Sequence, residues 1–346
     1  MSRGSAAESG PGATPDSLVE RAAALHAASI VIDAHSDILM GLTDGTTTWE
    51  AGAPEAPTDH GCNGQVSLPL LEAGGVTAQI FAIFTAPFDL NYRPLRPEYA
   101  GATQARALAM LAVFHEARIT YANRFRLATT AEDVRQAKRD SVVAGILAFE
   151  GLDPIGIDLR LLRLFRELGV TIATLTWSNR NPLADGSSVA RHSGGLSMLG
   201  EEAVAELERL GILIDLAHLG PNSVEEILEQ TTKPLLVSHI RLSDEARARM
   251  LRRVGEQGGV ACAIFYQVPT VAALVDQIEA LMDLCGPQGA GLGADFYGTS
   301  HAPIEVQTVA DFPRITEELL RRGYSDEVVR GILGENFLRL YQQVVG

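Results

Sequence analysis

The 346-residue sequence is poor in cysteine and in long apolar runs. Its three cysteines, Cys62, Cys262 and Cys285, lie far apart without metal-type spacing, so we expect no disulfide framework and a reducing compartment. No stretch reaches the roughly 18 apolar residues that a membrane span needs, and the first residues lack the apolar core of a signal peptide. We therefore expect a cytoplasmic protein without a membrane partner.

Basic residues are also scarce. Lysine and arginine together number 28 against 43 aspartates and glutamates, which gives a formal net charge of -15. This charge repels phosphate backbones and anionic lipids, so we expect no nucleic-acid partner. Lysine itself occurs only at Lys138 and Lys233.

Apolar residues are abundant, at 46% of the chain, which excludes a disordered or fibrous protein. Short apolar runs alternate with stretches whose apolar residues recur every three or four positions. The eight runs are residues 30–34, 77–83, 142–149, 171–175, 212–216, 234–237, 260–265 and 290–294. Apolar strands that alternate with helices indicate a parallel sheet buried on both faces. Eight of them predict an α/β fold, the (β/α)8 TIM-type barrel; an open doubly wound sheet stays open as an alternative, without the usual nucleotide-binding motifs.

The length fits either two average domains or one barrel. We predict a disordered N-terminal extension over residues 1–16, which is rich in Gly, Ala, Ser and Pro, and a single barrel domain over residues 17–346. Two long connections, residues 41–66 and 85–105, are typical of lids or binding loops.

Imidazoles and carboxylates stand at the ends of five of the eight runs. They are His35, Asp37, Glu150, His218, His239 and Asp295. The catalytic groups of barrel enzymes project from the carboxyl ends of strands. A lone histidine or aspartate there is usually structural, but three imidazoles and three carboxylates at one rim would be strained without a cation. The pattern therefore predicts a divalent metal site in a metal-dependent hydrolase.

The residue types narrow the choice of metal. Nitrogen and oxygen ligands without sulfur favour zinc, with manganese or iron as alternatives. His35 and Asp37 can grip one ion together because residues i and i+2 of an extended segment face the same side. Glu150 is placed to bridge two metals, so a two-metal hydrolytic centre is the working hypothesis. Neither lysine follows a predicted strand, which excludes a carboxylated-lysine bridge and Schiff-base chemistry.

These motifs resemble those of the renal (membrane) dipeptidase family, the zinc dipeptidases of peptidase family M19. The resemblance extends from about residue 31 to residue 341. The matching blocks are IDAHSD at 32–37, QVSLP at 65–69, EAGGV at 72–76, AFEG at 148–151, LIDLAH at 213–218, VSH at 237–239, GLGADF at 291–296 and ENFLR at 335–339. The resemblance implies the same (β/α)8 barrel, a homodimer and two Zn²⁺ per chain.

The resemblance also assigns a role to each matching side chain. The implied ligands are His35 and Asp37 for the first zinc, Glu150 as the bridge, and His218 and His239 for the second zinc. The implied acid/base carboxylate is Asp295, and the implied substrate-binding residues are Arg241 and Tyr266. The implied reaction is hydrolysis of a dipeptide, in which a zinc-bridging hydroxide attacks the amide carbonyl and Asp295 passes a proton to the leaving amine.

Two departures from the family pattern bear on the substrate. Trp177 stands where the family often has a histidine, and its indole can donate a hydrogen bond but not accept one. We assign Trp177 and Asn179 to substrate binding, with the loop residue His192 as a candidate substitute for the missing histidine. The segment after His239 is shorter than in the family, so Arg241 is either a substrate ligand or a surface arginine, and bulkier substrates become plausible.

Three functions stay open. The first is a metal-dependent dipeptidase, with a small peptide as substrate. The second is a specialised amidase of the same family that acts on a peptide-derived or cysteinylglycine-type conjugate in a biosynthetic pathway. The third is a non-catalytic metal-binding member of the family. We expect structural roles for Trp49, His60, His115 and His301.

Overall fold

The computed structural model describes residues 15–51, 64–85, 102–189, 194–299 and 301–346. All eight predicted runs form strands. The strands are β1 (Ile32–Asp33), β2 (Ala78–Phe84), β3 (Phe125–Leu127), β4 (Val143–Glu150), β5 (Val170–Thr174), β6 (Leu213–Asp215), β7 (Leu236–Ile240), β8 (Val260–Ala263) and β9 (Ala290–Leu292). The additional strand, β3, has only three residues and no apolar run to reveal it.

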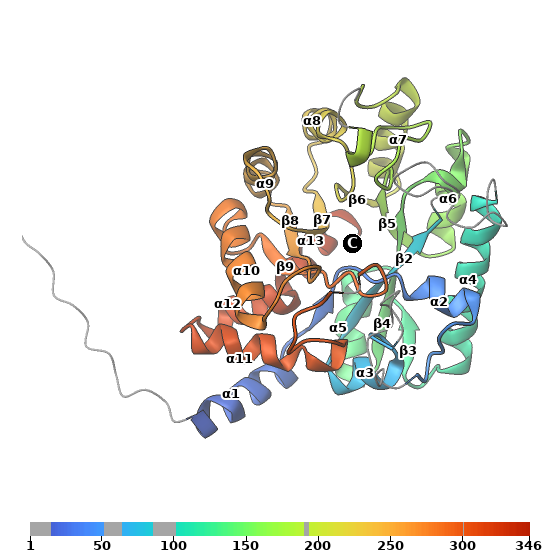
Figure 1. Cartoon of the computed structure of the whole chain (residues 1–346). Coiled ribbons are helices and arrows are strands. Elements are labelled where there is room, and N and C mark those ends of the chain that lie inside the picture. The colour runs from blue at the N-terminus through green and yellow to red at the C-terminus, as the bar shows by residue number, and fades with distance from the viewer. Residues whose placement is uncertain (1–14, 52–63, 86–101, 190–193, 300) are drawn as a thin grey trace, which may run out of the picture.

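Eight strands close into a barrel. The parallel order is β1-β2-β4-β5-β6-β7-β8-β9, and β3 pairs with β4 outside this path. Closure between the last and the first strand comes from the Ala34 amide, which donates to the Leu292 carbonyl at 2.9 Å, and from a parallel bridge between Ser36 and Phe296. The fold is therefore the predicted (β/α)8 barrel, and Figure 1 looks into its ring of strands.

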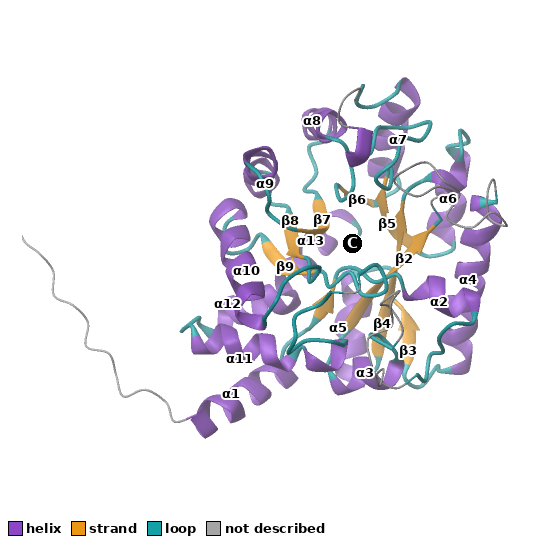
Figure 2. Ribbon diagram, viewed as in Figure 1, coloured by secondary structure: helices purple, strands orange, loops and turns teal. Residues whose placement is uncertain are grey.

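Helices surround the barrel, as Figure 2 shows. They are α1 (Pro15–Ala28), α2 (Ile38–Asp44), α3 (Leu68–Ala73), α4 (Thr103–Thr120), α5 (Ala131–Asp140), α6 (Arg160–Glu167), α7 (Met198–Arg209), α8 (Pro221–Gln230), α9 (Glu245–Glu256), α10 (Val271–Cys285), α11 (Pro313–Arg321), α12 (Asp326–Arg330) and α13 (Asn336–Val344). Side-chain caps begin several of them; Thr270, for example, accepts a hydrogen bond from the Ala273 amide at the start of α10. None of the helices among the described residues is long and apolar enough to cross a membrane.

Helix α13 closes the amino-terminal end of the barrel. Its Phe337 and Tyr341 pack with Ile146 and other apolar side chains of the barrel interior, and the Tyr341 hydroxyl donates to Thr171 Oγ1 at 2.7 Å near the start of β5. The C-terminus consequently lies in the middle of the ring in Figure 1. With this end plugged, the barrel opens only where the strands have their carboxyl ends.

Candidate metal centre

The structure brings the six predicted imidazoles and carboxylates together at the carboxyl end of the barrel. His35 and Asp37 follow β1, Glu150 ends β4, His218 follows β6, His239 lies in β7 and Asp295 follows β9. His35 Nε2 lies 3.5 Å from Asp37 Oδ2, 3.5 Å from Glu150 Oε2 and 3.9 Å from Asp295 Oδ1. His218 Nε2 lies 2.9 Å from Glu150 Oε1 and 2.8 Å from His239 Nε2. These distances join strands that are far apart in the sequence into one cluster.

Glu150 stands at the centre of this cluster. One carboxylate oxygen, Oε2, faces His35, and the other, Oε1, faces His218. The side chain is buried because Glu150 pairs with Thr174 of β5 and with Phe84 of β2, which enclose it on both sides. A buried carboxylate with one oxygen on each side has the geometry of a bridge between two positive centres.

Hydroxyl groups fix the outer nitrogens of two of the imidazoles. Ser178 Oγ lies 3.0 Å from His218 Nδ1, and Ser238 Oγ lies 2.9 Å from His239 Nδ1. Partners of this kind orient a metal-binding ring and select its tautomer. Both Nε2 atoms are therefore directed into the cluster.

Two buried aspartates hold the strand ends in register. Asp33 Oδ1 accepts from the Ala294 amide at 2.8 Å and joins β1 to the segment that carries Asp295. Asp215 Oδ1 accepts from the Ala217 and Ser238 amides at 3.0 and 2.9 Å, so it joins the residues just before His218 and His239. Burial raises the pKa of Asp33 to about 6, against the hydrogen bonds that it accepts.

The backbone is strained at two of the clustered residues. His218 and Asp295 have φ angles of 63° and 60°, in the left-handed region that costs a non-glycine residue of order 1–3 kcal/mol. Gly298 lies against the same carboxylates: a Cβ atom there would come within 2.3 Å of Asp295 Oδ1 and 2.5 Å of Asp37 Oδ2. Strain and close approach of this kind concentrate at functional sites.

The clustered charges shift one another's protonation. Burial disfavours ionisation of Glu150, but His35 and His218 outweigh it and hold the pKa of Glu150 well below its usual value. Burial likewise opposes the charged form of His35, yet the Glu150 and Asp37 carboxylates raise the pKa of His35 well above its usual value. Burial and the Glu150 charge raise the pKa of Asp37 to about 7. These carboxylates repel one another and need more positive charge than one imidazolium supplies.

The residues present fit a divalent metal. His35 Nε2 and Asp37 Oδ1 are buried and lack a hydrogen-bond partner among the described residues, which is costly unless an ion or another group satisfies them. His35, Glu150 and His239 offer ligand atoms within 4.8 Å of one another, and so do His35, Asp37 and Asp295. The nitrogen and oxygen donor set suits zinc. Both lysines lie elsewhere: Lys138 belongs to α5, and Lys233 Nζ donates to the Glu208 carbonyl at 2.7 Å.

Arg241 and Tyr266 form a separate exposed group at the ends of β7 and β8. Arg241 Nη1 donates to Gln267 Oε1 at 3.0 Å, and Gln267 Nε2 donates to the Tyr266 hydroxyl at 2.9 Å. The Tyr266 ring in turn meets the His301 ring at 6.2 Å. The role of Arg241 and Tyr266 in substrate binding stays a prediction.

Trp177 and Asn179 follow β5. The Trp177 ring lies 5.9 Å from the His218 ring, at the edge of the cluster. Asn179 Oδ1 instead accepts from Ser188 Oγ at 3.0 Å. The loop after His239 is short, because β7 ends at Ile240 and α9 begins at Glu245.

The remaining predictions concern residues away from the cluster. Trp49 packs against Phe81 and Phe125 in the core, which fits the structural role expected of it. His115 Nε2 bonds to the Leu168 carbonyl at 2.9 Å. The residues Cys62, His60 and His192 lie outside the described residues.

Sequence reasoning missed the supporting residues. Ser178, Ser238, Asp33, Asp215 and Gly298 contact the clustered side chains or fix their backbone. Each is close in sequence to a predicted ligand or to Trp177, and proximity was the only signal. The hydrogen-bond partner of a serine or an aspartate beside a ligand is defined only when the strands lie together in the barrel.

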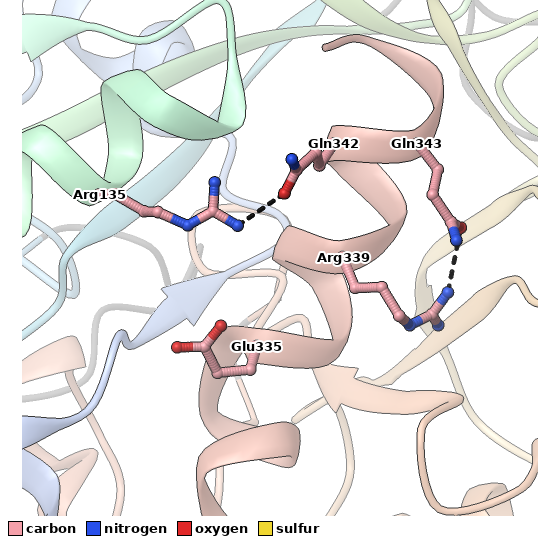
Figure 3. A pocket seen from close by; sticks show the side chains of 5 residues that line it. All are labelled: Arg135, Glu335, Arg339, Gln342 and Gln343. Carbon is pink, nitrogen blue, oxygen red and sulfur yellow. Dashed lines mark hydrogen bonds between the residues drawn. The ribbon is translucent and has the colours of Figure 1, made fainter.

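A pocket at the opposite end of the barrel has a different character (Figure 3). It is lined by Arg135, Glu335, Arg339, Gln342 and Gln343. The lining side chains bond to one another: Arg135 Nη2 donates to Gln342 Oε1 at 2.7 Å and Arg339 Nη1 to Gln343 Oε1 at 3.2 Å (Figure 3). It belongs to the closed end, on α5 and α13, and contributes nothing to the metal centre.

Comparison with known proteins places these features in a family context. The profile of the family described as "Membrane dipeptidase (Peptidase family M19)" matches residues 19–345. Dipeptidase 3 of Homo sapiens is 28% identical over 345 residues, which cover 94% of this chain and 67% of that protein.

Two solved structures of metallopeptidases have a similar fold. A dipeptidase described as a metallopeptidase of family M19 has a TM-score of 0.79 at 26% identity, over 92% of this chain and 99% of that one. A metallopeptidase from Rhodobacter sphaeroides, liganded with a phosphinate mimic of the dipeptide L-Ala-D-Ala, has a TM-score of 0.79 at 25% identity, over 91% and 99%.

Proposed function

The chain belongs to the membrane dipeptidase family, peptidase family M19, and from this premise we propose that it hydrolyses dipeptides with two Zn²⁺ bound at the open end of the barrel. The observation that carries the proposal is the position of Glu150, whose two oxygens face His35 on one side and His218 on the other. A single metal would leave one of these oxygens and its imidazole partner without an ion.

The side chains divide into two ligand sets. His35 and Asp37 would hold one ion, and His218 and His239 the other, with Glu150 shared between them. Two zinc ions would supply a water of lowered pKa and a Lewis acid for the amide carbonyl.

Asp295 is the proposed proton carrier. Its Oδ1 atom lies 3.9 Å from His35 Nε2, and its side chain keeps some exposure while the ligands beside it are buried. From this position it can hold a proton at the rim of the cluster and deliver it to the nitrogen of the leaving amine. Arg241 and Tyr266, at the ends of the neighbouring strands β7 and β8, would hold the substrate carboxylate.

The decisive experiment is release of free amino acids from a mixed dipeptide library by the zinc-loaded protein, with and without a chelator. We expect chelator-sensitive release, and loss of that release in His218→Ala and in Asp295→Ala. His115→Gln, remote from the cluster, is the matched control for replacement of a histidine and should keep wild-type release. Near wild-type turnover in either active-site variant would refute the mechanism, and no release by the wild type would favour a non-catalytic metal-binding protein.

One observation favours a second candidate, an amidase that acts on a bulkier peptide-derived conjugate. The loop between Ile240 of β7 and Glu245 of α9 is short, and it borders the open end of the barrel. Kinetics on simple dipeptides and on S-substituted cysteinylglycine separate the two. A kcat/KM that is higher on the conjugate than on all simple dipeptides would favour the amidase.

A further inference from the structure

Two aromatic rings extend the cluster toward one side of the barrel mouth. The Phe84 and Trp177 rings meet edge to face, with centroids 5.2 Å apart and an interplanar angle of 72°. Trp177 in turn lies 5.9 Å from the His218 ring. Phe84 and Trp177 are both half-buried, unlike the fully buried aromatic residues of the core. An apolar surface thus begins directly beside a proposed metal ligand.

The direction of Phe84 follows from the register of its strand. Ala78 and Ile80 of β2 pack inside the barrel, whereas Phe81 packs outside against the helices. Because side chains alternate along a strand, Phe84 shares the inward face with Ile80, one layer nearer the opening. It also pairs with Glu150 across the sheet, so the ring and the proposed bridging carboxylate lie in the same layer.

The backbone of Trp177 lies close to two glycines. A Cβ atom on Gly151 would come within 3.1 Å of the Trp177 nitrogen, and one on Gly186 within 2.3 Å of its carbonyl oxygen. The main chain at Trp177 is therefore packed closely between two neighbouring segments of backbone, those that carry Gly151 and Gly186.

The strand order shows which part of a substrate this surface meets. Asp295 follows β9, and Trp177 follows β5, which is four strands away in either direction around the barrel. Arg241 follows β7, two strands from β9, and Tyr266 follows β8, the strand next to β9. If the leaving amine and its carboxylate lie toward β7–β9, the acyl half of the scissile bond extends toward β2 and β5.

We propose that Phe84 and Trp177 form a binding wall for a large apolar or aromatic side chain on the acyl residue, the N-terminal residue of a dipeptide. The proposal rests on the proposed function, because it takes the orientation of the substrate from the role of Asp295. An aromatic surface gains from burial and from ring–ring geometry with an aromatic ligand, and it offers no acceptor to a polar one. The acyl side chain would thereby be selected by apolar contact with Phe84 and Trp177 and not by a polar contact.

The first test compares kcat/KM for the series Xaa-Gly and Gly-Xaa, with glycine, leucine or phenylalanine as Xaa. For the wild type we expect Phe-Gly to exceed Gly-Gly by about 10-fold or more, in the range that hydrophobic pockets achieve. In Phe84→Ala and Trp177→Ala that ratio should fall several-fold. The ratio of Gly-Phe to Gly-Gly should be the same in all three proteins. Equal acyl-side ratios in the wild type and both variants would overturn the proposal.

A second test does not depend on turnover. Two phosphinate pseudodipeptides that differ only in a benzyl group or a hydrogen on the acyl side are titrated calorimetrically into the zinc-loaded protein. We expect tighter binding of the benzyl compound in the wild type and a smaller difference in both variants. Equal affinities of the wild type for the two compounds, or binding of neither compound, would overturn the proposal that Phe84 and Trp177 form a binding wall. Benzyl selectivity in a protein that hydrolyses no dipeptide would support the wall and refute the proposed function.

Ile119→Ala is the control variant for both tests. Ile119 is an exposed apolar residue in the last turn of α4, which runs back from the mouth to the closed end of the barrel. Its truncation removes apolar surface of comparable kind without touching the wall. It should leave both substrate ratios and the difference between the two phosphinates as in the wild type, and circular dichroism confirms that each variant is folded.

Discussion

His218 and His239 face each other with their Nε2 atoms 2.8 Å apart, while the Nδ1 atom of each ring lies beside a serine hydroxyl. In this arrangement one Nε2 must donate to the other, because two lone pairs or two N–H groups would repel. Burial and the charges of His35 and His218 lower the pKa of His239 well below its usual value, which favours its neutral form. A neutral imidazole, which keeps a lone pair on one ring nitrogen, is the form that binds a metal.

The serine beside His239 should therefore tune metal affinity. Ser238→Ala removes the hydroxyl 2.9 Å from His239 Nδ1, and the ring loses the partner that sets its tautomer and direction. We expect zinc affinity to fall by about 10–100-fold, measured by competition with a chromophoric chelator. Ser223→Ala, which removes another buried serine hydroxyl from α8, is the control and should bind zinc as the wild type does. An unchanged affinity in Ser238→Ala would show that the hydroxyl has no part in the site.

The number of bound metals should depend on Glu150. Glu150→Gln keeps the size of the side chain but replaces one of the two oxygens that face His35 and His218. We expect about two zinc ions per wild-type chain and one or fewer in the variant, by elemental analysis after gel filtration. Glu318→Gln changes another buried carboxylate, one that pairs with Arg322, and should keep the wild-type zinc content. Two zinc ions in Glu150→Gln would contradict a bridging role.

The sequence predicted the strands and the clustered ligands for a physical reason. Parallel strands buried on both faces need continuous apolar runs, and the carboxyl ends of barrel strands meet at one rim, so a residue such as Glu150 or His218 could be placed without coordinates. Strand β3 was not predicted because its residues Phe125–Leu127 contain no apolar run.

Other features could not be predicted because they depend on assembly. The orientation of Ser238 and the two hydrogen bonds that Asp215 accepts, from the Ala217 and Ser238 amides, exist only when β6 and β7 lie side by side. Nor does any local pattern indicate that His218 adopts a positive φ. The edge-to-face contact of Phe84 with Trp177 joins β2 to the segment after β5, two strands that are not neighbours in the barrel.

Gly298 should be required for full catalytic activity. It lies against Asp295 and Asp37 but does not have a positive φ, so the strain in Gly298→Ala arises from the contacts at 2.3 and 2.5 Å with those carboxylates. A displacement of about 1 Å at a reacting group can cost about 100-fold in rate, and we expect kcat/KM on a dipeptide to fall by that order. Gly194→Ala, whose Cβ would meet no atom of the described residues closer than 3.9 Å, is the control and should keep its activity. A fully active Gly298→Ala would show that the carboxylates can move freely.

His26 is a buried histidine that connects three helices. His26 is almost fully buried, and its ring nitrogens bond to Thr316 Oγ1 at 2.7 Å and to the Gly74 carbonyl at 2.8 Å. The ring thereby ties α1 to α11 and to the end of α3. Burial lowers the pKa of His26 below its usual 6.5, although the bond to Gly74 opposes the shift.

This shift makes the stability of the fold sensitive to pH. As the pH falls below 6.5, His26 in the unfolded chain takes up a proton before His26 in the folded chain does, so the unfolded state is favoured. The contribution is fully present above 6.5 and is lost below it, at no more than about 1.4 kcal/mol per pH unit. We expect urea unfolding to show a larger loss of stability between pH 7.5 and pH 5.5 in the wild type than in His26→Gln, whose side chain does not titrate. Between pH 8.5 and pH 7.5 the two proteins should change alike, and an identical loss below pH 7.5 would mean that His26 is protonated as readily in the folded chain as in the unfolded one.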